Sequence, residues 1–141
     1  IHKEAARTLV HSRLEYFNTW YDYQYNRVAI RNPRRSWGSC TSLNNLNFSY
    51  KLLFLPPCLA DYVILHELCH LGELNHSSRF WALMAQVMPD YQERRRRLRQ
   101  LEKAVGSHPT HLAAHRERFC CGECVTSEQH RSTVLVPPQN Q

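Results

Sequence analysis

The sequence has no apolar run that approaches the ~20 residues needed to cross a bilayer, although apolar residues make up 43% of its 141 positions. Its first residues, IHKEAARTLVHSRLEYF, are amphipathic and charged and do not resemble a signal peptide. We therefore expect a soluble globular protein with no membrane partner. Because residue 1 is isoleucine rather than methionine, we also expect the chain to be processed or to be part of a longer protein.

Evenly spaced cysteines are also missing. Small secreted proteins that depend on disulfides have such a framework, whereas the six cysteines here fall into two groups. The first group lies in apolar segments, where a free cysteine behaves as a small hydrophobic side chain, and the second crowds near the C-terminal end: Cys40, Cys58 and Cys69, then Cys120, Cys121 and Cys124. This pattern favours a reducing, cytoplasmic location.

Acidic residues are outnumbered, and the formal net charge is +6. The whole excess lies in residues 1–105, which hold 15 Lys and Arg against 9 Asp and Glu. A basic surface favours anionic partners, and the run RRRRLR at 94–99 offers cations for phosphates. Consecutive arginines point all around a helix, however, so a solvated face is the favoured interpretation and a nucleic-acid partner the weaker one. Arg94 or Arg95 is expected at the edge of the core.

The spacing of apolar residues predicts helices and strands over residues 1–105. The expected helices cover about 5–21, 58–71, 77–88 and 90–105; the expected strands are 27–31 and the two arms of a hairpin within 36–54. The hairpin turns at Asn44-Asn45, since asparagine tolerates the backbone of a tight turn, and its second strand extends through Leu52. Gly38 in the first arm indicates a bulge or a close backbone approach.

Beyond Gly106 the periodicity fails, and the chain contains no internal repeats. We therefore predict one α+β domain over residues 1–105 and a mobile tail over residues 106–141.

The stretch HELCHLGELNH at 66–76 is the strongest chemical signal. On a helix, residues four apart project to the same side, so His66 and His70 can hold one Zn²⁺. Glu67 is rotated by about 100° from His66, where a general base acting on zinc-bound water stands. A chance match is the alternative, but three ionisable groups in an apolar helix are costly to bury without a partner. The metal site is therefore the favoured interpretation.

A zinc site needs a third protein ligand. His76 is the leading candidate, provided that the chain leaves the helix after His70 and folds back. Gly72 is available to end the helix and Asn75 to cap the next one. The alternative ligands are Glu73, Asp90 and Glu93.

With three ligands and one Zn²⁺ per chain, the expected chemistry is amide hydrolysis without a covalent intermediate. Zinc-bound water, activated by Glu67, attacks a peptide carbonyl, and Glu67 then delivers the proton to the leaving amine. A second oxyanion donor is not identified by the sequence; an Arg or a Tyr fits the role. Three alternatives stay open: a metal-dependent nucleotide pyrophosphohydrolase, a DNA-associated protease and a non-catalytic metal-binding module.

Several longer stretches together resemble the YgjP-like metallopeptidases, minimal zincins related to the SprT-like and WLM proteases. They are RNPRRSWGSC, NLNFSYKLLFLPP and DYVILHELCHLGELNHSSRFWALMAQVMPDYQERRRRL, and the resemblance covers about residues 1–103. It implies a zinc-dependent peptidase with ligands His66, His70 and His76 and with Glu67 as base. It also implies a zincin-like α+β fold, in which an N-terminal helix packs on a three-stranded antiparallel sheet beside the active-site helix, with two further helices after it. One departure is Ser36, where such proteins commonly have a basic residue.

Two further groups of residues are weaker candidates. Trp37, Gly38 and Ser39 are candidates for substrate binding, if their strand is the sheet edge along which a peptide pairs; a core role for Trp37 is the alternative. Cys121 and Cys124 form a C-x-x-C pair, a candidate second metal site, although cysteines with no structural role are favoured.

Overall fold

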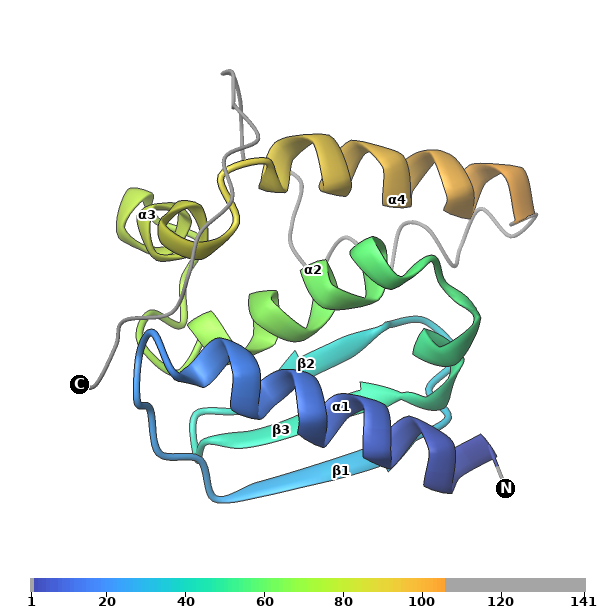
Figure 1. Cartoon of the computed structure of the whole chain (residues 1–141), viewed down its shortest axis with the longest axis horizontal. Helices are drawn as coiled ribbons and strands as arrows, with labels where there is room; N and C mark the ends of the chain where they lie inside the picture. Colours follow the sequence, from blue (N-terminus) through green and yellow to red (C-terminus); the bar gives the residue numbers. More distant parts are fainter. Residues whose placement is uncertain (1, 106–141) are drawn as a thin grey trace.

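The computed structural model describes residues 2–105 of the chain. Four α-helices, three strands and one 3₁₀ helix follow in this order: α1 (His2–Asn18), β1 (Arg27–Arg31), β2 (Gly38–Cys40), β3 (Asn45–Ser49), η1 (Tyr50–Phe54), α2 (Pro57–Cys69), α3 (Ser78–Val87) and α4 (Tyr91–Val105) (Figure 1). The α+β class is as predicted, and each expected helix is present with ends shifted by a few residues. None of the described helices is long and apolar enough to cross a membrane.

The sheet is mixed, so the prediction of a purely antiparallel sheet is wrong. Its strand order is β1-β3-β2, with β1 parallel to β3 and β2 antiparallel to β3. The end of β1 and the start of β2 lie at the same end of the sheet, where Arg31 and Gly38 pair with Ser49 and Phe48. They are two strand spacings apart, about 10 Å, and the connection 32–37 is long enough to cross the end of β3. The chain therefore skips β3 and adds β2 on its far side.

The expected hairpin is present but shorter than predicted. Asn44 has a positive φ of 63° and forms its turn, as expected from the tolerance of asparagine for that backbone. The second arm ends at Ser49, whose side chain accepts a hydrogen bond from the backbone N–H of Lys51 (3.0 Å) and caps η1. The alternation of apolar and polar residues through Leu52 therefore does not continue the strand. Leu52 belongs to the 3₁₀ helix η1 and is buried there.

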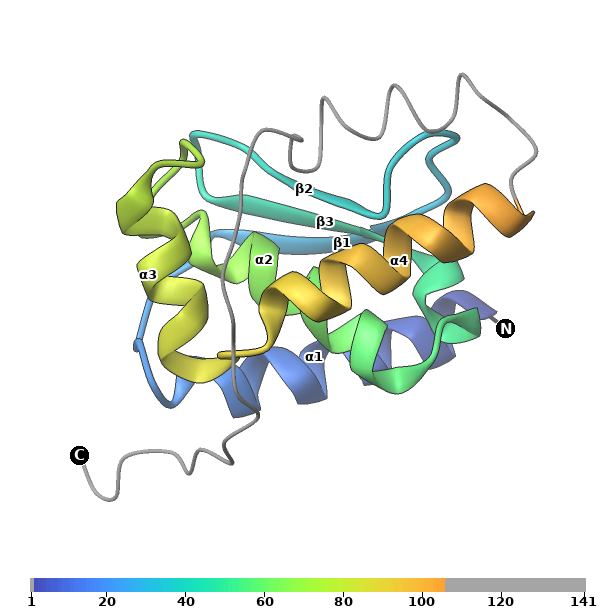
Figure 2. The same ribbon diagram turned by 90° about the horizontal axis from the view of Figure 1, so that it is seen from above.

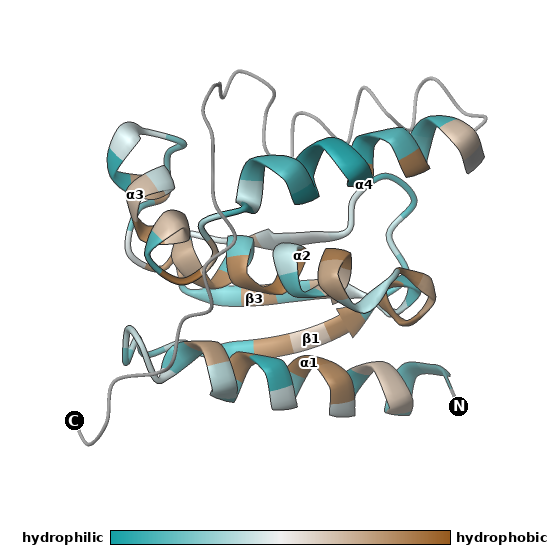
Figure 3. Ribbon diagram, turned by 45° about the horizontal axis from the view of Figure 1, so that its top comes forward, coloured by the Kyte–Doolittle hydropathy of each residue, from teal (hydrophilic) through white to brown (hydrophobic). Residues whose placement is uncertain are grey.

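Helix α2 runs through the centre of the domain. It packs against α1, β2 and β3 and against α3 and α4, and Figures 1 and 2 show it between α1 and α4. From Leu59 to Cys69 nearly every side chain is buried. Full burial of each Leu, Ile or Val is worth about 1.5–3 kcal/mol, so this helix is a rigid support for the motif that it carries. The outer helix α4 is strongly hydrophilic by comparison (Figure 3).

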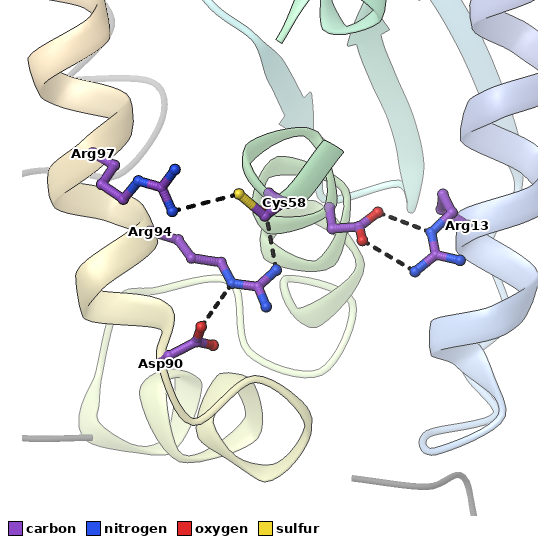
Figure 4. A network of polar contacts seen from close by, with 6 residues as sticks. Arg13, Cys58, Asp90, Arg94 and Arg97 are labelled. Atoms are coloured by element: carbon purple, nitrogen blue, oxygen red, sulfur yellow. Dashed lines mark hydrogen bonds and ion pairs between the residues drawn. The ribbon is translucent and has the colours of Figure 1, made fainter. Parts of the chain in front are cut away.

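Side-chain contacts at the start of α2 hold its two neighbours in place (Figure 4). Arg94 of α4 donates from Nη1 to the carbonyl of Cys58 (3.1 Å) and from Nε to Asp90 (3.1 Å). Arg97 donates from Nη1 to Cys58 Sγ (3.7 Å). On the other side, Arg13 of α1 forms a bidentate ion pair with Asp61. Helix α4 therefore lies across α2 in a fixed position.

Candidate metal centre

His66 and His70 come from the last turn of α2, where the four-residue spacing places both imidazoles on one side. The helix ends at Cys69, and His70 is its C-cap, still with a helical φ of −67°. His66 is fully buried and His70 is 7% exposed. Phe80 stacks on the His70 ring at 4.5 Å between centroids. The two histidines are therefore held by the end of the helix and by apolar packing.

His76 reaches the same place because the chain turns sharply after α2. Gly72 makes this turn possible by its small size, not by the left-handed backbone expected of a helix-ending glycine, since no glycine in the described residues has a positive φ. A Cβ at Gly72 would lie 2.2 Å from the Tyr23 hydroxyl oxygen. The cap of α3 is Ser77, which accepts from the backbone N–H of Phe80 (3.4 Å). The prediction of Asn75 as the cap is therefore wrong.

The three histidines form one compact group. Their candidate ligand atoms lie within 4.8 Å of one another, and the ring centroids of His70 and His76 are 4.7 Å apart. The alternative ligands face other partners: Glu73 pairs with Arg79, Asp90 with Arg94 and Glu93 with Arg96. The structure thus brings together the three residues that the sequence ranked first.

The protonation of this group suits a cation. Burial lowers the pKa of His66 to about 3, with Arg95 adding to the effect. Burial and the two other histidines lower the pKa of His76 to about 3, and burial also lowers the pKa of His70. All three imidazoles are then neutral near pH 7, with lone pairs available for a metal. His70 donates from Nδ1 to the carbonyl of Glu73 (3.0 Å), which leaves its Nε2 as the ligand atom.

Glu67 lies beside the histidines and is 1% exposed. Its Oε2 is 3.4 Å from Nδ1 of His66. Burial raises its pKa to about 7, against an opposing effect of His70. A carboxyl group with such a pKa accepts and returns a proton near neutral pH, as a general base requires.

The three candidate substrate-binding residues lie at the start of β2. Gly38 packs against Glu67, so the close backbone approach expected at this glycine is present. Ser39 Oγ accepts a hydrogen bond from the Asn47 amide (3.3 Å). Trp37 is half-buried against the core and donates from Nε1 to Glu102 (2.7 Å). Their role in substrate binding stays a prediction, and Trp37 has at least a structural contact.

Sequence reasoning missed several residues around the group. Trp81 stacks on His76 at 5.9 Å, and Glu102 is buried to 6% exposure. The sequence pattern alone assigned neither residue to the site. A signal was present, because Glu102 lies four residues after the buried Leu98 and so on the same helix face. The candidate second site at Cys121 and Cys124, like the tail itself, lies outside the described residues.

Comparison with known proteins agrees with this geometry. Residues 1–101 match the protein family described as "YgjP-like, metallopeptidase domain". A comparison with curated proteins finds no match. A solved structure, the metallopeptidase zymogen of Pyrococcus abyssi abylysin, is similar with a TM-score of 0.60 and 26% identity, over 67% of this chain and 95% of that one. The chain therefore belongs to the YgjP-like metallopeptidase family.

Proposed function

We propose that this protein is a zinc-dependent peptidase that uses His66, His70 and His76 as ligands and Glu67 as its general base. The observation that carries the proposal is the compact group of three neutral imidazoles, two of them buried and that of His76 half-buried, with a carboxyl group of raised pKa beside it. Imidazole nitrogen is a preferred ligand of zinc, and three protein ligands leave one position for chemistry. Membership of a metallopeptidase family points to peptide bonds as the target.

The roles of the side chains follow from their positions. Bound Zn²⁺ would supply a Lewis acid and lower the pKa of water at the site. Glu67 takes a proton from that water as its oxygen attacks the carbonyl carbon, and later gives the proton to the leaving nitrogen. Its pKa of about 7 suits both transfers.

The substrate backbone is proposed to lie along β2. In the described sheet this strand is at one edge, paired with β3 on one side. Its first residue, Gly38, packs on Glu67, so a peptide that adds to this edge would pass beside the general base. Such strand addition fixes a peptide through backbone hydrogen bonds and does not depend on its side chains.

Metal content tests the ligand set. We expect near one zinc in purified wild-type protein and a large loss in His76→Ala, by elemental analysis. His11→Ala is the matched control, because His11 is exposed on α1 and should leave the zinc content unchanged. Wild-type protein that binds no zinc after zinc is resupplied would contradict the proposal.

Glu67→Gln tests the chemistry. This variant should fold and keep its metal, because the amide has the shape of the carboxylate, but should lose turnover of a casein-derived peptide mixture followed by mass spectrometry. Retained turnover would exclude Glu67 as the base. No turnover in wild-type protein loaded with zinc would favour a non-catalytic metal-binding role.

A further inference from the structure

One face of α4 lies over the candidate metal centre, and side chains at both ends of this face contact residues that border the centre. Tyr91, Arg95, Leu98 and Glu102 are spaced four, three and four residues apart, so they share this face. Tyr91 stacks on Trp81 at 5.0 Å, and Trp81 stacks on His76. At the other end, Glu102 accepts the hydrogen bond from Trp37, next to Gly38. Arg95 therefore lies between the His76 side and the Glu67 side of the site.

The neighbouring arginines point elsewhere. Arg94 and Arg97 reach the first turn of α2 at Cys58 (Figure 4), and Arg96 pairs with Glu93 on the surface. Arg95 differs, because its Nε is buried and its position on α4 shares a helix face with both Tyr91 and Glu102. Of this run of four arginines, Arg95 is therefore the one that we place over the histidine group.

A guanidinium beside a cation site is unfavourable by itself, because like charges repel at short range. An anionic oxygen between the two charges would be attracted by both. A second observation points the same way: among residues 2–105, nothing accepts a hydrogen bond from the buried Nε1 of Trp81, whose ring stacks on His76. A buried donor without an acceptor costs about 1–3 kcal/mol. Both features suit a site that binds an oxygen acceptor.

We infer that Arg95 is the second oxyanion donor of this site and binds the carbonyl oxygen of the scissile peptide bond as negative charge develops on it. This inference rests on the proposed peptidase function. Arg95 comes from α4, whereas Glu67 comes from α2 and packs against Gly38, so the donor and the base are supplied by different helices.

The reaction step is balanced with these groups alone. As the oxygen of water bonds to the carbonyl carbon, the π electrons of the C=O bond move to its oxygen, and Glu67 takes the proton. Arg95 donates a hydrogen bond to that oxygen and stays protonated. When the C–N bond breaks, the electron pair returns to re-form the carbonyl and Glu67 protonates the leaving nitrogen.

Arg95→Gln and Arg95→Lys test the inference against the matched control Arg96→Gln, which removes the same charge from the next, exposed position. The substrate is the peptide that wild-type protein cleaves fastest in the casein-derived mixture. We expect Arg95→Gln to lower kcat by about 10²–10³-fold, as loss of an oxyanion donor does, with KM changed little. Arg95→Lys should recover part of the loss, and Arg96→Gln should match wild type.

Zinc affinity, measured by competition with a chromogenic chelator, gives a readout without turnover. Removal of the positive charge should leave the zinc Kd of Arg95→Gln unchanged or lower, whereas a purely structural role of Arg95 would raise it. An unchanged kcat in Arg95→Gln, or a raised zinc Kd with kcat restored by excess zinc, would overturn the inference and leave the peptidase proposal standing.

Peptides with free and with amidated C-termini test whether Arg95 binds a substrate carboxylate and not the scissile carbonyl oxygen. If Arg95 bound a substrate carboxylate instead, its replacement would raise KM for the free acid only, and the inference would be wrong. A wild-type protein that binds zinc and cleaves no peptide would remove the proposed function and this inference together.

Discussion

The backbone of Gly38 lies directly against the side chain of Glu67. A Cβ at Gly38 would be 3.1 Å from Cγ of Glu67 and 3.0 Å from the carbonyl oxygen of Asn47. Both distances are tighter than ordinary van der Waals contact, and the Asn47 carbonyl belongs to the central strand β3. Glu67, the proposed general base, is therefore held between its own helix and the edge strand of the sheet.

Gly38→Ala should consequently disturb the base more than the metal. The added methyl group displaces Glu67 or bends β2, and a misplacement of a reacting group by about 1 Å is enough to lower the rate by about 10²-fold. We expect a loss of kcat of at least 10-fold with zinc content near wild type. Ser39→Ala, one residue along the strand, is the control and should retain most activity, because the proposed strand addition uses the backbone of Ser39 and not its side chain. A variant with normal kcat would show that Glu67 tolerates the change.

The loop that carries His76 depends on the contact between Gly72 and Tyr23. A Cβ at Gly72 would be 2.2 Å from the Tyr23 hydroxyl and 2.8 Å from its Cζ, and the Tyr23 ring is stacked on Tyr21. Gly72→Ala must therefore move the loop or the ring. We expect weaker zinc binding, measured by chelator competition, because His76 moves away from the other two ligands.

Tyr23 variants make this prediction specific. Tyr23→Phe alone should bind zinc normally, whereas Tyr23→Ala combined with Gly72→Ala should recover part of the affinity, since the ring no longer blocks the methyl group. If the double variant binds zinc no better than Gly72→Ala, the loop is displaced for another reason.

The sequence predicted the histidine group well because its chemistry is local. Two of the histidines are four residues apart at the end of one helix, and the third follows within six residues, so short-range geometry sufficed. The parallel pairing of β1 with β3 depends on residues 18 positions apart, such as Arg27 and Asn45. Alternation of apolar residues identifies a strand but not its neighbour, so the strand order was beyond a local pattern.

The surroundings of the site were harder to predict for the same reason. The link from Trp37 to Glu102 joins residues 65 positions apart. In the run of arginines at 94–97, the sequence indicated that Arg94 or Arg95 lies near the core, but only the packing of α4 on α2 separates their roles. Helix orientation is set by tertiary contacts, and a charged face gives little signal of it.

Glu102 should make the stability of the metal-free protein depend on pH. Burial raises its pKa from 4.5 to about 7, against opposing effects of the Trp37 hydrogen bond and of Arg99. Between these values the folded state holds a proton that the unfolded state has lost, so the free energy of unfolding falls as pH rises from about 4.5 to 7. The size is on the order of 3 kcal/mol.

Denaturant titrations of wild type and Glu102→Gln at several pH values isolate this contribution. Glutamine can still accept a hydrogen bond from Trp37 and does not titrate. The free energy of unfolding of the variant should therefore rise relative to that of wild type as pH increases through that window, and the difference should stay constant above about pH 7. A constant difference over the whole range would show that Glu102 does not titrate within it.

Arg13 and Asp61 join α1 to α2 at a distance from the metal centre. Nε and Nη2 of Arg13 donate to the two carboxylate oxygens of Asp61 at 2.8 and 3.0 Å, and the guanidinium also lies 4.6 Å from the centroid of the Tyr16 ring. Arg13→Lys keeps the charge and loses the bidentate geometry. Since both side chains are partly exposed, we expect a loss of about 1 kcal/mol in the free energy of unfolding, with zinc affinity and kcat unchanged.

Arg27→Lys, at an exposed position of β1, is the control and should unfold like wild type. A change in zinc affinity in Arg13→Lys would instead mean that the position of α1 is coupled to the end of α2, where His66 and His70 lie.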